Sequence, residues 1–250
     1  FGLAGPLYAF CLFGLFVMIA TRIWLPEKRF PVEVREVLRD PFGAPRRHAE
    51  QQGEKRPSIW LDKRVQPFLI FALLSTMCGM GFVQTVGFTI IDVMKLPPEE
   101  AIHYIAGALT IGAIVTVICQ WGLIPMLSLS TSALMCWGAG IAALGALVTA
   151  VGGGYWHIVV GFGVNSVGLS LLRPGNAAGM SLAVGPADQG RVAGAMGQIG
   201  GMFGFSAVFV ALHTLHPALP YWIFVVTLAG LAGYTILNPA LNGQRQPARA

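Results

Sequence analysis

Long apolar stretches, nearly free of charged residues, are the main pattern along this chain. A bilayer core about 30 Å thick requires roughly 20 apolar residues in one helix, and seven stretches have that length. We therefore predict an all-α, polytopic membrane protein with about seven transmembrane helices. The predicted spans are Gly2–Ile23, Pro67–Ile91, Ile102–Ile124, Ser130–Val151, Trp156–Val184, Val192–Leu215 and Leu219–Leu237.

Two places in this pattern are ambiguous. Between the third and fourth spans, 121–132 carries no charge, and only Pro125 and a cluster of Ser and Thr residues indicate a turn. If that turn is absent, the number of spans falls by one. The fifth span contains Arg173, Pro174 and Gly175, and we expect an interruption there because an internal proline removes a helical hydrogen bond.

Composition agrees with a lipid environment. Hydrophobic residues make up 55% of the chain and charged residues 11%, against roughly 25% charged residues in an ordinary soluble domain. The four cysteines lie inside the apolar stretches, without metal-ligand spacing, so we interpret them as small core residues rather than a disulfide or zinc framework. They are Cys11, Cys78, Cys119 and Cys136.

The distribution of Lys and Arg predicts the orientation. If the loop 25–65, which is rich in both, is cytoplasmic, alternation over seven spans leaves Lys95 as the one basic residue outside. The chain then divides into a transmembrane helix (1–24), a cytoplasmic linker loop (25–65), a six-helix part (66–238) and a cytoplasmic tail (239–250). We expect the linker to lie near anionic headgroups. A regulatory or nucleic-acid site there has no support beyond charge, so we expect no nucleic-acid partner.

Three segments carry a resemblance to a known family. Residues 172–179 read LRPGNAAG, and residues 190–194 and 197–204 read GRVAG and GQIGGMFG. These are similar to the tenth and eleventh helices of drug:proton antiporters, including the tetracycline-efflux-like branch, and 96–101 (LPPEEA) is similar to their outer loop between the seventh and eighth helices. One span, a long charged loop and six closely spaced spans resemble the last seven helices of a twelve-helix major facilitator superfamily transporter.

This resemblance implies a function. It implies a secondary active transporter in the cell (inner) membrane that exports a small organic molecule or drug by proton antiport through alternating access. Its partners would be the lipid bilayer, the substrate, protons and an N-terminal transporter half, with no cofactor. A chain that begins at Phe1 without Met is expected to be a fragment. The chain departs from the family pattern in two ways. The given sequence does not include the first five helices, where relatives keep their coupling carboxylates, and the segment before the fourth span lacks basic residues.

Polar residues within the spans are the candidates for function. A cation inside a span is costly and usually faces a cavity or a partner, which makes Arg173 the strongest candidate. The resemblance places the second and fifth spans at the substrate cavity. The cavity candidates are Gln84, Asn165, Ser166, Arg173 and Asn176. Two alternatives remain open at this point: Arg173 reaches toward the headgroups or caps a broken helix, and the amides only bond neighbouring helices.

The sixth span has many glycines, several of them spaced four apart. This spacing is typical of a helix that packs closely against another. The predicted packing residues are Gly190, Gly194, Gly197, Gly200, Gly201 and Gly204. Near the predicted outer ends of spans, Asp92 is expected to be an interfacial cap and the histidines at 103, 157, 213 and 216 to be solvated.

The remaining alternative is a non-transporting seven-helix membrane protein. A receptor of this kind would have longer outer segments, and an intramembrane enzyme would have Asp, Glu, His or Ser clustered at one depth. The sequence has neither pattern, and it has no metal-binding motif. We therefore expect a protein that is not an enzyme.

Overall fold

The structure is a computed structural model, and it describes residues 5–24, 58–127, 129–185 and 188–242. The chain forms two units, Phe1–Arg56 and Pro57–Ala250. The first unit contains α1 (Gly5–Trp24), a 20-residue apolar helix where the first span is predicted. Most of the predicted linker loop lies outside the described residues.

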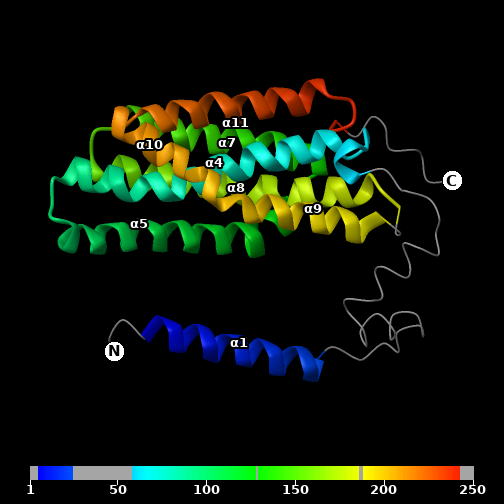
Figure 1. The fold of residues 1–250 in the computed structure, drawn as a ribbon, viewed down its shortest axis with the longest axis horizontal. Helices are drawn as coiled ribbons and strands as arrows, with labels where there is room; N and C mark the ends of the chain where they lie inside the picture. Colours follow the sequence, from blue (N-terminus) through cyan, green and yellow to red (C-terminus); the bar gives the residue numbers. More distant parts are fainter. Residues whose placement is uncertain (1–4, 25–57, 128, 186–187, 243–250) are drawn as a thin grey trace. The chain divides into compact units, whose positions relative to one another are not determined.

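The second unit is a bundle of helices whose axes run roughly alongside one another (Figure 1). Its long helices are α4 (Gln66–Met94), α5 (Pro98–Ile118), α7 (Thr131–Val151), α8 (Tyr155–Leu182) and α11 (Leu219–Leu237). Its shorter helices are α6 (Ile124–Leu127), α9 (Gln189–Gly201) and α10 (Ala207–Leu215). The described residues contain helices, turns and no strand, as the sequence predicts.

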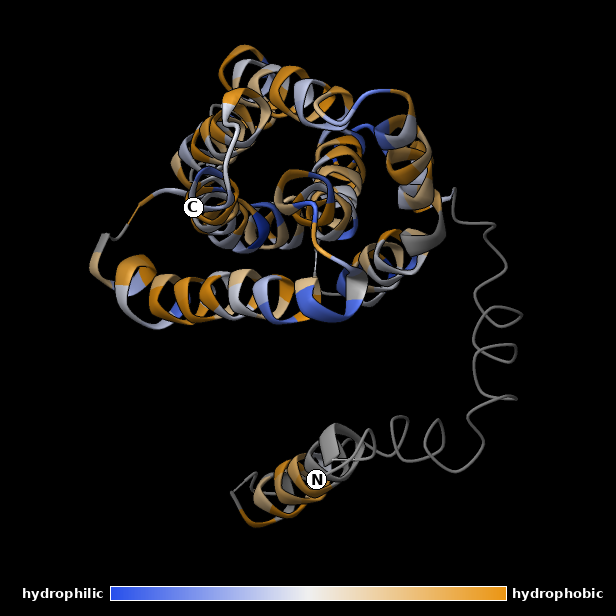
Figure 2. Cartoon of the chain, turned by 90° about the vertical axis from the view of Figure 1, so that its left-hand side faces the viewer, coloured by the Kyte–Doolittle hydropathy of each residue, from blue (hydrophilic) through white to orange (hydrophobic). Residues whose placement is uncertain are grey.

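Five helices in the described part of the chain are long and apolar enough to cross a membrane, counting α5 together with its continuation to Met126. Seen along the helix axes, hydrophobic residues lie on the outward faces of the bundle as well as between the helices (Figure 2). An apolar exterior of this kind is expected where lipid, rather than water, surrounds the helices. The protein is therefore a membrane-embedded helical protein.

The ambiguous junction between the third and fourth spans is a true break. α5 continues through a π-helical segment, Cys119–Leu123, into α6, and α7 begins at Thr131. The side chain of Ser130 caps α7 by accepting a hydrogen bond from the backbone N–H of Ala133 at 3.3 Å. Two separate helices are thereby confirmed, because an N-cap satisfies backbone donors that a continuing helix would have bonded internally.

The predicted interruption of the fifth span at Arg173–Gly175 is wrong. α8 runs unbroken from Tyr155 to Leu182 with Pro174 inside it. Proline removes one hydrogen bond, the one to the carbonyl of Ser170, and the helix is held on both sides of this point by packing in the bundle. Gly175, for example, lies so close to α7 that a Cβ there would be 2.9 Å from the Cβ of Leu134.

The predicted sixth span is not one helix. It divides into α9, a 3₁₀ segment (Met202–Ser206) and α10. The break follows Gly200 and Gly201, and glycine costs about 1 kcal/mol per residue relative to alanine in a helix interior. The predicted span over Val192–Leu215 is therefore helical but interrupted, and five helices long and apolar enough to cross a membrane, rather than seven, are present among the described residues.

The glycines that pack helices together lie on α7 and α8. At Gly138, Gly145 and Gly168, an added Cβ would meet backbone atoms of the facing helix at 2.8 Å or less. By contrast, no atom lies within 4 Å of a Cβ built on the predicted packing residues of α9, which are Gly190, Gly194, Gly197, Gly200 and Gly201. That face therefore contacts no other helix of the described bundle, and the surroundings of Gly204 lie outside the described set.

α8 is the central helix, and it packs against α7, α4 and α5. An aromatic cluster joins α4, α8 and α11: the ring of Phe82 lies 5.8 Å from that of Phe162, 5.1 Å from Tyr221 and 5.8 Å from Phe224. Tyr221 also shares a 2.6 Å hydrogen bond with Thr89 of α4. These contacts fix α4 and α8 relative to each other, and the candidate site lies between them.

Candidate functional site

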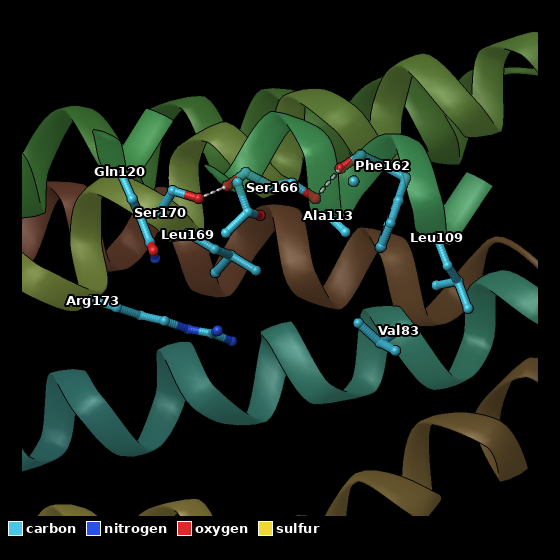
Figure 3. A pocket seen from close by; sticks show the side chains of 11 residues that line it. Val83, Leu109, Ala113, Gln120, Phe162, Ser166, Leu169, Ser170 and Arg173 are labelled. Carbon is cyan, nitrogen blue, oxygen red and sulfur yellow. Dashed lines mark hydrogen bonds between the residues drawn. The ribbon is translucent and has the colours of Figure 1, made fainter. Parts of the chain in front are cut away.

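A cavity of about 250 Å³ lies between α4, α5 and α8 (Figure 3). Its lining residues come from the middle of α4 and α8, and from α5 and the π-helical segment that follows it. They are Val83, Leu109, Gly112, Ala113, Thr116, Gln120, Phe162, Ser166, Leu169, Ser170 and Arg173. In Figure 3 the two ends differ, since Gln120, Ser170 and Arg173 lie toward one end and Val83, Leu109 and Phe162 toward the other.

α8 supplies a polar stripe. Ser166, Ser170 and Arg173 are four and three residues apart, so they share one face of the helix. The hydroxyl of Ser166 donates to the carbonyl of Phe162 at 2.8 Å, and the hydroxyl of Ser170 donates to the carbonyl of Ser166 at 2.7 Å. Because each hydroxyl has a single hydrogen, both serines offer the cavity acceptors only.

α5 supplies the facing wall. Gln120 lies in the π-helical segment, a type of helix distortion that is frequent at functional sites. Thr116 lies one turn before it. Nearer the other end, Gly112 allows the ring of Phe162 to lie directly against the backbone of α5, and an added Cβ there would overlap that ring. Phe162 therefore closes the apolar end of the cavity, while Gln120 presents an amide at the polar end.

The guanidinium of Arg173 lies at the depth of the helix centres. A Cβ on Gly79 would be 2.9 Å from Nη2 of Arg173 and 3.1 Å from Cδ1 of Leu169. Gly79 is next to the central residue of α4, and Leu169 is at the centre of α8. A helix of about 42 Å that crosses a core of about 30 Å has its centre within about 6 Å of the midplane. The guanidinium is therefore far from either headgroup layer.

Arg173 is the one cation among the cavity residues, and none of them is acidic. Within the described part of the chain, the acidic residues lie before helices or near helix ends. They are Asp62, Asp92, Glu99, Glu100 and Asp188. No ion pair or hydrogen bond from the Arg173 guanidinium to another described residue is present. Arg173 is exposed in the described bundle, and its charge is uncompensated there, which is costly wherever lipid or a second bundle excludes water.

The structure separates the predicted cavity residues into two groups. Ser166 and Arg173 line the cavity. Asn165 instead points to α7, where its Nδ2 donates to the carbonyl of Ala142 at 2.9 Å. Asn176 is 2% exposed and is not part of the lining.

Gln84 also has a structural partner. Its Nε2 donates a short hydrogen bond to the hydroxyl of Ser206, in the 3₁₀ segment that interrupts the sixth predicted span. The amide thus ties α4 to the break between α9 and α10. Neither Gln84 nor Asn165 lines the cavity, so bonding between neighbouring helices describes them better than contact with a substrate.

Sequence reasoning missed three polar members of the site: Thr116, Gln120 and Ser170. The spacing of Thr116 and Gln120, one turn apart in an otherwise apolar stretch, was a usable signal. So was the spacing of Ser166, Ser170 and Arg173 along one face. The π-helical segment that presents Gln120 had no evident sequence signal.

A second polar contact joins α4 to α10. His213, which is 4% exposed, has Nε2 2.9 Å from Oδ2 of Asp92 and Nδ1 3.1 Å from the carbonyl oxygen of Pro217. These contacts tie the ring of His213 to the end of α4 and to the turn before α11. The expectation that His213 is solvated was wrong.

The ends of the bundle carry further polar contacts outside the cavity. Arg64 forms a 2.8 Å salt bridge with Asp62, just before α4, and its hydrogen bonds hold the pKa of Asp62 below its usual value. The described residues contain no group of three or more His, Cys, Asp or Glu side chains that could hold a metal ion. No protein-family model and no curated protein matches the sequence.

Proposed function

We propose that this protein is a secondary transporter of the major facilitator type, and that it moves a small organic molecule across the membrane by alternating access in exchange for protons. The observation that carries this proposal is the cavity between α4, α5 and α8. It lies at the depth of the helix centres, and it combines polar and apolar lining. Binding near the bilayer midplane is typical of secondary transporters.

The proposal includes a second helical bundle. In the resemblance, the six spans from α4 to α11 form one half of a transporter, and substrate binds between the two halves. The surface of α5 supports a second bundle, because only 17% of the most apolar stretch of this helix and its continuation is buried inside the described bundle. Lipid, the second half or both would cover the remaining surface.

A flux experiment tests this function. The chain, together with the second bundle that the proposal includes, is reconstituted into liposomes that contain the pH-sensitive dye pyranine, and an inward gradient of benzenesulfonate, phenyltrimethylammonium or tetracycline is imposed. A proton antiporter changes the internal pH when its substrate enters. We expect a protein-dependent pH change with at least one solute. Radiolabelled solute that enters without a pH change would retain transport and exclude proton coupling, and the absence of both signals for all three solutes would exclude the proposed function.

Two variants on α5 form a matched pair for this experiment. Ala113 lines the cavity, whereas Ala106 is on the same helix outside the lining, and both are exposed. We expect Ala113→Trp to abolish flux because the indole fills the cavity. Ala106→Trp, which adds the same side chain outside it, should retain flux.

A further inference from the structure

We infer that the cavity binds an organic anion, with the charged group of the ligand at Arg173 and its apolar body toward Phe162. This inference rests on the proposed function, because it names the class of molecule that the transporter would carry. It depends on three observations, which are the position of the guanidinium, the donors available in the cavity and the difference between its two ends.

The position of the guanidinium excludes the simplest structural role. A cationic side chain that only avoids lipid directs its charge to the headgroups. The guanidinium of Arg173 instead lies beside Gly79, next to the central residue of α4. The absence of a Cβ at Gly79 leaves room for the guanidinium there, since a Cβ would be 2.9 Å from Nη2. The charge is therefore held at the depth where it is most costly, beside an open cavity.

The available donors favour an anion over a neutral ligand. Arg173 has five N–H donors in a planar fork that matches a carboxylate, sulfonate or phosphate group. Ser166 and Ser170 already donate their only hydroxyl hydrogens to backbone carbonyls. Gln120, toward the same end of the cavity in Figure 3, offers an amide N–H₂ as a second donor. With no carboxylate in the lining, an organic cation would be repelled and an anion would compensate the charge of Arg173.

The apolar end of the cavity favours a ligand whose uncharged part is apolar. Val83, Leu109 and Phe162 line it, and they present hydrocarbon and one aromatic ring. Burial of apolar surface there contributes about 25 cal/mol per Å². An inorganic anion gains nothing from this end. A small aromatic or aliphatic anion uses both ends, so we infer an amphiphilic organic anion as the ligand.

Direct binding tests this inference without relying on transport. The full chain, purified in detergent, is titrated with radiolabelled benzenesulfonate and with phenyltrimethylammonium, which have one ring and opposite permanent charges. We expect binding of the sulfonate and little or none of the cation. Arg173→Gln should weaken sulfonate binding about 10- to 100-fold, as the loss of a charged hydrogen bond does. Lys95→Gln, which removes an exposed cation at the end of α4, is the control and should leave binding unchanged.

A second measurement needs no variant and covers the case in which Arg173→Gln does not fold. Phenylglyoxal reacts with accessible, unpaired guanidinium groups, and mass spectrometry of the wild-type protein reports modification of Arg173. We expect modification at Arg173, slowed by benzenesulfonate and not by phenyltrimethylammonium. An unreactive Arg173, or one that benzenesulfonate fails to protect, would overturn the inference.

The outcomes separate this inference from the proposed function. Sulfonate binding that depends on Arg173, without flux in liposomes, would retain the anion site and exclude transport. Flux of phenyltrimethylammonium without sulfonate binding would retain transport and overturn the anion site. Equal sulfonate binding by the wild type and Arg173→Gln, or no sulfonate binding at all, would also overturn it.

Discussion

Close packing of α7 on α8 predicts a measurable effect of one methyl group. A Cβ on Gly168 would be 2.5 Å from the carbonyl oxygen of Gly138 and 2.7 Å from the Cα of Ala142, and both are backbone atoms that no side-chain rotation can move. Ordinary contact begins at 3.4 Å, so Gly168→Ala requires α7 and α8 to separate locally by about 1 Å.

The size of the effect follows from two opposing contributions. Overpacking a tight interface costs about 1 to 3 kcal/mol. Replacing glycine by alanine inside a helix gains up to about 1 kcal/mol. We therefore expect Gly168→Ala to lower the free energy of unfolding by about 1 to 2 kcal/mol, and the melting temperature by roughly 2 to 8 °C. Gly163→Ala on the same helix should show only the gain, because no atom lies within 4 Å of its Cβ.

A thiol-reactive fluorophore can measure both variants. Cys78 and Cys119 are buried, so they react when heating exposes them in detergent. The expected order of melting temperatures is Gly163→Ala at or above the wild type, and Gly168→Ala below it. If Gly168→Ala melted at or above the wild type, the close approach of α7 and α8 would be refuted.

Two further variants test other contacts. Above pH 3.8, the ordinary pKa of Asp62, the variant Asp62→Asn should melt at a lower temperature than the wild type. The hydrogen bonds from Arg64 lower the pKa of Asp62 in the folded protein, so the ionised carboxylate stabilises the fold. The difference in melting temperature should shrink as the pH falls, because protonation of Asp62 removes this stabilisation. Asn165→Leu should retain flux in the liposome assay and lose about 0.6 kcal/mol of stability, because its hydrogen bond joins helices and leaves the cavity untouched.

Run length and hydropathy were sufficient to place most of the helices. α4, α7 and α11 begin and end within three residues of the predicted spans, because a membrane helix must satisfy all of its backbone groups internally over a fixed thickness. The same reasoning did not predict the 3₁₀ segment at Met202–Ser206. An average over a window reports how apolar a segment is, and it does not report whether glycine interrupts the helix within that segment.

Spacing of small residues was a poor guide to packing. Glycines four apart on α9 face no described helix, whereas Gly138, Gly145 and Gly168, which are seven apart or on different helices, make the closest approaches. A glycine permits close packing, but the partner decides whether the packing forms. For α7 and α8 the partner is the next helix in the chain across a short turn, which favours antiparallel contact along their full length.

The hydrogen-bond partners of polar residues within the spans could not be predicted from the sequence. Gln84 and Asn165 have the chemistry and depth of cavity residues, yet their amide N–H groups donate to the hydroxyl of Ser206 and to the carbonyl of Ala142. Those partners are 122 and 23 residues away, so the sequence alone gives no sign of the pairing. Arg173 has no such partner in the described bundle. A charge at the centre of a membrane protein is more costly to leave unpaired than a neutral amide, so an uncompensated cation beside a cavity is a stronger candidate for binding a ligand than a residue that is merely polar and deep.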